Sequence, residues 1–505
     1  MYKLLLCWRY LKTRYIALAC IVSVTLGVAT MIVVNSVMGG VSRETKERMN
    51  DVLGDITIRG RSLEGIPNYE WHHQEIMRLL GDDVVAMTPV AHVPAMLGYY
   101  TSGQYMTQQV QVMGIDPESY NQVCAYTEFL QHPENREHPD FELKDSGYDT
   151  VDHSASNPAK AQSREVMATA GWLHRRQVAE FNKRLEVSPE STHLQDTDDN
   201  PHNPFAAESA PVAEDFNPAT DQHTGTVVQL GFCTHETGAG GIGFHLLPGD
   251  DIEITFPSAG RPPKPLVSKL TVTDLYDSKI QMVDGNIIFM PLDKLQEMRG
   301  MIDPQSGVRF VNAIQLKLKP GVDQNTARDL LREHFQPHLY SVYTWRDLQG
   351  PMLTAITVEI VILNLLLFLI IAVAGFGILA IFFMIVVEKT RDIGILKSLG
   401  ASSSGVMGIF LTYGFSLGLV GAGCGVLLGL IIAYNVQEIA EAFAVFAGID
   451  LYDSSIYPTL EIPTLVEPFT VSWIALGAMG IAVLASVFPA LRAAKMHPVE
   501  ALRFE

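Results

Sequence analysis

The chain has 505 residues, of which 55 are acidic and 36 basic, giving a formal net charge of -19 at pH 7. That charge argues against a nucleic-acid partner, which requires a basic surface, and five cysteines are too few for a disulfide scaffold. Hydrophobic residues make up 48% of the chain but are unevenly spread: four long apolar runs contrast with residues 50–351, which have the composition of a soluble domain.

The chain opens with a basic segment followed by an apolar run. Residues 1–14 contain four basic side chains and no acid, and residues 15–37 contain no charge at all. A run of this length can span the hydrocarbon core, whereas a cleaved signal peptide has an apolar region of about 7–15 residues. We therefore predict a cytoplasmic N-terminus at 1–14 and a retained transmembrane helix at 15–37 that continues as a helix through SRETKERMNDVL.

Residues 38–351 are predicted to form an extracytoplasmic α+β domain, because the hydrophobic period changes from helical to alternating at Asp55. Helical periodicity returns at 70–80 and 324–334. The mixture indicates an α+β domain in two lobes. The expected strands are 55–60, 84–94, 108–113, 230–232, 251–256, 266–275, 286–290 and 312–318.

An acidic insert interrupts this domain at 132–225, with 18 Asp and Glu against 8 Lys and Arg. Such a composition buries too little apolar surface to offset chain entropy, so most of the insert is predicted to be disordered. One helix is expected at 161–185. The histidines of the insert fit no standard metal-ligand spacing, so we interpret them as solvated. The face of that helix would comprise Val166, Ala170, Leu173, Val178, Phe181 and Leu185.

Two cysteines, Cys124 and Cys233, lie in the soluble stretch. They could pair in an oxidising compartment or remain two buried thiols. The sequence favours the thiols.

A charged segment, EKTRDIGILKSLG at 388–400, separates the second apolar run, 356–387, from the third. Read as a helix, it places Ile393, Leu396 and Leu399 on one stripe, with its charges towards other faces. Gly400 then supplies a natural helix stop. Two interpretations are open: a helix lying on a membrane surface, or a docking element that passes force from a soluble partner to the membrane helices.

The third run, 406–434, contains glycines at four-residue spacing, which make a smooth face for another helix. Residues 435–469 form a loop with six acids and no Lys or Arg, and the fourth span is predicted at 470–488. The positive-inside rule then places both termini, 1–14 and 489–505, and the charged segment in the cytoplasm, and the loop and soluble domain outside. The helix-packing glycines are Gly414, Gly418, Gly421, Gly425 and Gly429.

Motifs for catalysis are missing from the sequence. It has no phosphate-binding G-x-x-x-x-G-K-[ST] loop, no H-E-x-x-H and no Gly-x-Ser-x-Gly elbow. We therefore expect no catalytic residue, no metal site and no cofactor bound by this chain. The energy for its work would come from another protein.

Three stretches resemble one family. They are RYLKTRY with LGVATMIVVNSVMGGVSRETKERM, then EKTRDIGILKSLGAS, and finally FPALRAAKMHPVEALRFE. They are similar to the opening helix, the cytoplasmic coupling helix and the ending of the FtsX/MacB class of ABC transporter permeases. Within that class they look most like the lipoprotein-releasing permeases LolC and LolE. The insert at 132–225 departs from the family pattern.

The resemblance implies a permease that dimerises, as a homo- or heterodimer, in the inner membrane with a large periplasmic domain. It implies a separate ATPase, which uses ATP and Mg²⁺ and whose closure is relayed outward by mechanotransmission. The cargo would be a lipoprotein or other envelope substrate, with a periplasmic chaperone as a further partner. The implied ATPase-coupling residues are Glu388, Lys389, Arg391, Asp392, Ile393, Leu396, Lys397, Leu399 and Gly400.

Alternatives within and outside this class remain. A MacB-like exporter of peptides or small molecules would use the same helices, and so would an FtsX-like regulator of a cell-wall hydrolase. MacB-like members carry an ATPase ahead of the first helix, and this chain begins almost at that helix, so we expect its ATPase on another polypeptide. A membrane-anchored sensor without an ATPase is the remaining interpretation.

Overall fold

The computed structural model describes residues 15–62, 65–101, 104–153, 163–187, 216–236, 242–278, 286–447, 462–497 and 499. Their contacts divide them into two compact units. A helical unit contains the described residues of 15–44, 351–447 and 462–499, and an α/β unit contains those of 45–350. The predicted cytoplasmic N-terminus at 1–14 and the last residues, 500–505, lie outside the described ranges.

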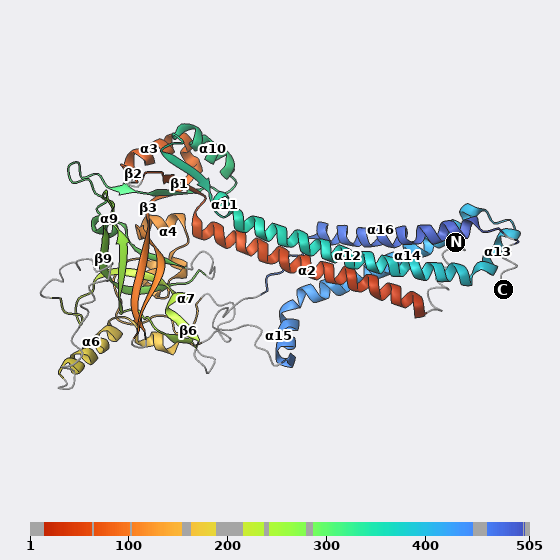
Figure 1. The fold of residues 1–505 in the computed structure, drawn as a ribbon, viewed down its shortest axis with the longest axis horizontal. Helices are drawn as coiled ribbons and strands as arrows, with labels where there is room; N and C mark the ends of the chain where they lie inside the picture. The colour runs from red at the N-terminus through yellow and green to blue at the C-terminus, as the bar shows by residue number, and fades with distance from the viewer. Residues whose placement is uncertain are drawn as a thin grey trace. The chain divides into compact units, whose positions relative to one another are not determined.

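Long helices build the helical unit, and Figure 1 shows α2, α12, α14 and α16 running alongside one another. Among the residues described, four helices are long and apolar enough to cross a membrane. The four predicted spans each fall inside one of them, and α2 continues to Leu53 as the sequence indicated. The helices are α2 Tyr15–Leu53, α12 Gly350–Glu388, α13 Thr390–Ser398, α14 Ser403–Tyr434, α15 Val436–Ala447 and α16 Pro468–Lys495.

Polar contacts join α2 to α14 and to α12 inside the unit. Thr25 Oγ1 on α2 donates to the Gly421 carbonyl on α14 over 3.1 Å. Asn35 Nδ2, also on α2, donates to Asn364 Oδ1 on α12 over 2.8 Å. Hydrogen bonds of this kind satisfy polar side chains in an apolar environment and fix how neighbouring helices align.

The α/β unit contains a mixed sheet in the order β13-β1-β12-β3-β4-β10-β5-β9-β8, and β3 also pairs with β8. Two small hairpin-like pairs, β11 with β2 and β6 with β7, lie outside it. Its strands are β1 Ile56–Gly60, β2 Ile66–Pro67, β3 Val84–Thr101, β4 Gln104–Ile115, β5 Thr224–Gln229, β6 Thr234–Glu236, β7 Ile242–Phe244, β8 Asp251–Pro257, β9 Pro265–Tyr276, β10 Ile287–Pro291, β11 Phe310–Val311, β12 Ala313–Leu318 and β13 Tyr340–Thr344.

Strand β3 connects two lobes of this unit. Its first half pairs with β12, as in Met87 with Leu316, and its second half pairs with β4, as in Val93 with Val112. The smaller lobe packs α3 and α10 on β1, β12 and β13, and Figure 1 shows these two helices together. The helices of the unit are α3 Tyr69–Leu80, α4 Pro117–Val123, α5 Pro133–Glu137, α6 Trp172–Val187, α7 Leu230–Cys233, α9 Leu292–Arg299, α10 Gln324–His334 and α11 Trp345–Leu348, with 3-10 turns at Gly81–Asp83, Thr127–Phe129 and Glu165–Thr169.

The expected strands are present with one exception. Residues 230–232, read as a strand, lie in the short helix α7, and strand β5 comes immediately before it. A short apolar run fits a buried helix turn and a buried strand equally well, so its period could not separate the two.

The prediction that most of the insert at 132–225 is disordered is wrong for its first described residues, 132–153. Gln131, His132 and Asn135 donate hydrogen bonds to the buried carboxylate of Asp274 on β9, with the Asn135 amide nitrogen 2.7 Å away. The Tyr148 hydroxyl donates to the Thr273 carbonyl over 2.6 Å and its ring is buried. The start of the insert therefore packs against β9.

Residues 163–187 are ordered as well, but not with the predicted helix face inward. Met167 and Ala170 are fully buried in the core, whereas Leu173, Val178 and Phe181 on α6 are exposed. A buried arginine, Arg175, holds α6 to the sheet instead. The prediction of disorder used the composition of the whole insert, and this average does not reveal the few residues that pack in the core. Residues 154–162 and 188–215 lie outside the described ranges.

Both cysteines of the α/β unit are free and buried. Burial raises the pKa of the Cys124 thiol to about 12, and its sulfur lies 3.6 Å from Gln315 Oε1. Burial likewise raises the pKa of the Cys233 thiol. The structure therefore supports two protonated core thiols and excludes a disulfide between them.

Candidate functional site

The charged segment forms α13, a nine-residue helix between α12 and α14. Gly400, at φ +94°, ends it: the Gly400 N–H donates to the Lys397 carbonyl, and the Ala401 N–H donates to the Leu396 carbonyl. This pair of bonds is a Schellman motif, in which the residue after the C-cap needs a positive φ that glycine adopts without strain. The helix stop predicted at Gly400 is confirmed.

The predicted apolar stripe of α13 is divided between two environments. Ile393 is 3% exposed and packs in the core of the helical unit, whereas Leu396 is 39% and Leu399 80% exposed. Ile395, which the stripe omitted, is 44% exposed. At about 100° per residue, Ile395 and Leu399 lie 40° apart, so they form the centre of the free face and Leu396 lies at its edge.

Charged residues of α13 also fall on different sides. Arg391 and Asp392 are exposed beside Ile395, and Lys389 Nζ lies 2.8 Å from Asp392 Oδ2. Glu388 and Gly400 are exposed too. We call Arg391, Asp392, Ile395, Leu396 and Leu399 the free face of α13. Its apolar centre and charged border are what a groove on a protein partner would recognise.

Lys397 performs a different task from the one predicted. Its Nζ donates to the Ala494 carbonyl over 2.6 Å and to the Met496 carbonyl over 2.7 Å. These are carbonyls at the C-terminus of α16, where a positive charge is favoured by the helix dipole. Lys397 therefore fastens α13 to α16 and is turned away from the free face.

The end of α16 completes this attachment. The sequence pointed to it as a family-like ending but not as a packing surface for the charged segment. Ala490, Ala493 and Ala494 are buried, and Ala490 and Ala493 belong with Ile393 to the core of the helical unit. Small side chains let a short helix approach closely. The spacing of alanines in FPALRAAK is the signal that could have identified this surface.

The five predicted glycines of α14 face two different helices. A Cβ at Gly418 would lie 3.0 Å from the Ala482 Cβ on α16, and Gly414 likewise faces α16. A Cβ at Gly425 would lie 2.7 Å from the Val28 Cβ on α2, and Gly421 and Gly429 face α2 in the same way. Contacts this short leave no room for a side chain, so α14 is the helix on which α2 and α16 both pack.

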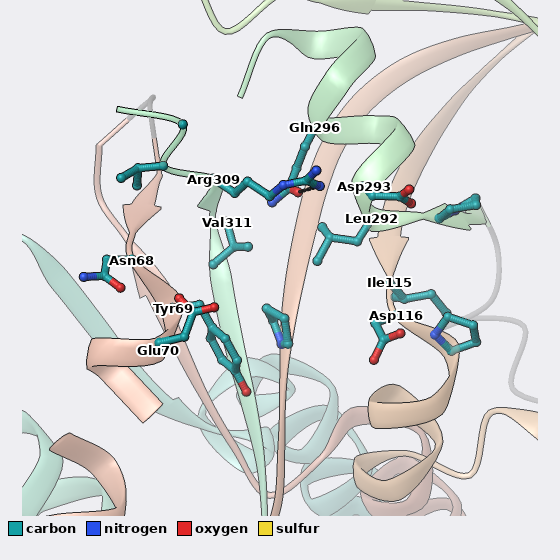
Figure 2. A pocket seen from close by; sticks show the side chains of 15 residues that line it. Asn68, Tyr69, Glu70, Ile115, Asp116, Leu292, Asp293, Gln296, Arg309 and Val311 are labelled. Carbon is teal, nitrogen blue, oxygen red and sulfur yellow. Dashed lines mark hydrogen bonds between the residues drawn. The ribbon is translucent and has the colours of Figure 1, made fainter. Parts of the chain in front are cut away.

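A cavity of about 480 Å³ in the α/β unit is the other candidate site. Figure 2 shows Arg309 beside Gln296, whose Oε1 accepts a 3.4 Å hydrogen bond from it, with Asp116 and Asp293 across the pocket. Glu70, Asp116 and Asp293 each lie at the start of a helix, and Asp116 accepts from the Ser119 N–H.

Acids at such positions stabilise helix N-termini, so the helices that form the pocket explain its charge. Burial, with Glu70 and Asp116 close by, raises the pKa of the lining Tyr69 to about 12, so that phenol stays protonated. We assign this pocket no chemistry. The free face of α13 is the stronger candidate.

Comparisons with known proteins bear on the helical unit. Residues 364–498 match the family described as FtsX-like permease C-terminal. The lipoprotein-releasing system transmembrane protein LolC of Xylella fastidiosa is 30% identical over 243 residues, 48% of this chain and 56% of that protein. LolE of Haemophilus influenzae, named in the same way, is 28% identical over 193 residues, 38% of this chain and 46% of that protein.

A third relative comes from another branch. The macrolide export ATP-binding/permease protein MacB of Salmonella paratyphi A is 27% identical over 210 residues, 41% of this chain and 29% of that protein. The chain spans 56% of the length of LolC from Xylella fastidiosa and 61% of that from Neisseria meningitidis. These likenesses confirm the resemblance to FtsX/MacB-class permeases and to LolC and LolE, and with the four apolar helices they indicate a multi-pass membrane protein.

Proposed function

We propose, from the FtsX-like permease domain that the chain carries at residues 364–498, that this protein is the permease subunit of an ABC transporter. A separate ATPase, which uses ATP and Mg²⁺, binds the free face of α13. Its closure moves α13 and the membrane helices, and the movement is relayed to the α/β unit on the other side of the membrane. The permease itself works as a dimer.

The observation that carries this proposal is the two-sided environment of α13. Its free face offers Ile395, Leu396 and Leu399 to a partner, while its other side is fixed to the helical unit by Ile393 and Lys397. A surface helix needs only its apolar contact with lipid. A helix that transmits force needs a rigid attachment to the elements it moves, and Lys397 with the alanines of α16 supplies one.

The charge distribution supports an orientation for the chain. Arg391, Lys397 and Arg492 lie at one end of the spans, whereas α15, at the far end of α14, contains acids and no Lys or Arg. By the positive-inside rule the first end is cytoplasmic. We therefore propose that the chain lies in the inner membrane with the α/β unit in the periplasm.

The proposed cargo follows from the names of the LolC and LolE relatives, of which LolC of Xylella fastidiosa matches over 243 residues. LolC and LolE are named for lipoprotein release, so we propose that this chain extracts lipoproteins from the inner membrane and passes them to a soluble periplasmic acceptor. The MacB relative is named for macrolide export, so export of a small molecule is the alternative function. Depletion of the permease distinguishes lipoprotein release from small-molecule export. Lipoproteins that then accumulate in the inner membrane indicate release.

The experiment compares variants of the tagged chain purified from membranes of its own organism. Leu396→Ala with Leu399→Ala removes apolar burial worth roughly 2 kcal/mol per side chain in a groove, without weakening the helix, since Ala is the best helix former. ATPase recovered with the chain should fall at least tenfold. The matched control is Leu427→Ala, another exposed leucine, on α14. Full recovery with the double variant would mean that α13 is only a surface helix.

A further inference from the structure

Helix α15 follows α14 after a single residue, Asn435, whose side-chain nitrogen donates to the Ile431 carbonyl over 2.7 Å. Three large exposed apolar side chains among its described residues are spaced four and three residues apart: Ile439, Phe443 and Phe446. At about 100° per residue they fall within an arc of about 60°. They are 45%, 61% and 89% exposed.

The polar side of α15 is the side that contacts the protein. Gln437 Oε1 accepts a 3.1 Å hydrogen bond from the Ile462 N–H, and Gln437 Nε2 donates to Glu441 Oε1 over 3.1 Å. Both side chains are partly buried, and they lie on the opposite side from the phenylalanines. A helix on the surface of a soluble protein shows the reverse arrangement, with its apolar stripe against the core.

The position of α15 in the chain restricts what can cover its apolar face. Because one residue separates it from a membrane-spanning helix, its first turn lies at the boundary between the apolar core and water. Lipid is present all around that boundary. An amphipathic helix of this kind lies in the interface, with its apolar side among the acyl chains and its polar side in the headgroup region.

We propose that α15 lies in the leaflet at which α14 ends, with Ile439, Phe443 and Phe446 inserted among lipid acyl chains. In the orientation proposed above, this is the periplasmic leaflet. Its only charged side chains are Glu438 and Glu441, so anionic headgroups do not attract it, and apolar insertion alone holds it. The proposal requires only that α14 crosses the membrane, and it is independent of the ATPase and the cargo.

The test places the photoreactive amino acid benzoylphenylalanine at Phe446 in the full-length chain, reconstituted in nanodiscs of the neutral lipid phosphatidylcholine. Glu438, exposed on the polar side, is the matched position. Benzophenone inserts into neighbouring C–H bonds, so a lipid adduct adds the mass of one phospholipid. We expect this adduct at Phe446 at least fivefold more often than at Glu438. Nanodiscs with an anionic lipid added should give the same ratio.

Three outcomes would overturn the proposal. A crosslink from Phe446 to a second copy of this chain, or to another segment of the same copy, would show that protein covers the face. Equal lipid adducts at the two positions would mean that α15 is not oriented by its apolar side. Adducts that form only with anionic lipid would contradict apolar insertion. Circular dichroism of each variant in the same nanodiscs reports whether the helices remain folded.

Discussion

The charged segment at 388–400 and the insert at 132–225 are both rich in charge, yet the sequence predicted the local structure of the first better than that of the second. The charged segment is short, and its helix and its stop at Gly400 depend on neighbours within a few residues. The described parts of the insert depend on distant partners: Tyr148 on Thr273 and Arg175 on Asp251. Structure that depends on neighbouring residues can be predicted from the sequence, whereas long-range contacts made by polar side chains cannot.

The largest expected effect tests whether the insert is part of the fold. Arg175, 3% exposed, donates to Asp251 over 2.7 Å and to the Gly249 and Asp221 carbonyls. Arg175→Ala removes the ion pair and the hydrogen bonds to both carbonyls, although Thr271 still donates to Asp251. We expect a loss of about 3 kcal/mol in unfolding free energy. The neighbouring Arg176→Ala is the control, because its contact with Asp145 is long and exposed. Chemical denaturation of the purified chain measures both. Equal and small losses of unfolding free energy in the two variants would show that the insert does not stabilise the fold.

The next prediction concerns the helical unit. Gly425→Val adds a side chain where Val28 and the Thr25 carbonyl leave no space, so it should cost about 2 kcal/mol through overpacking. Gly423→Val, two residues away, meets nothing within 4 Å and should leave stability unchanged. Thermal unfolding in detergent compares the two variants. If Gly423→Val were the more damaging, α2 would not pack on this face of α14.

The smallest expected effect is a pH dependence that originates where the insert meets β9. Burial raises the pKa of Asp274 from 3.8 to about 6, against the opposing effect of its hydrogen-bond donors. Since the folded state then binds the proton more tightly than the unfolded chain, this group favours folding as the pH falls through 6. Between pH 7 and pH 5 the gain should be about 1 kcal/mol.

A variant isolates that contribution. Asp274→Asn cannot titrate, so its unfolding free energy should lack this gain when both proteins are measured at pH 7 and pH 5. A variant with the same pH dependence as the natural chain would show that Asp274 is already ionised at pH 5 in the folded protein, and that its surroundings are more polar than the structure indicates.

Sequence reasoning identified the four apolar helices, most strands and the continuation of α2, because each has a strong period or a long uncharged run. It could not predict which residues of the α13 stripe are buried, because the burial of Ile393 and the exposure of Leu399 depend on where α16 ends. For the same reason it read Lys397 as a contact for a partner, although its charge is used inside the chain. It also missed the pairing of β3 with both β4 and β8, which no local pattern encodes.

The most direct test of force transmission through α13 is a crosslink from its free face in native membranes. Benzoylphenylalanine at Leu399, the most exposed apolar side chain of that face, should form an adduct whose partner peptide belongs to an ABC ATPase. The same group at Leu427 on α14 should form none with that protein. An adduct of Leu399 with lipid alone, while the ATPase is still recovered with the chain, would contradict the assignment of α13 as the coupling helix.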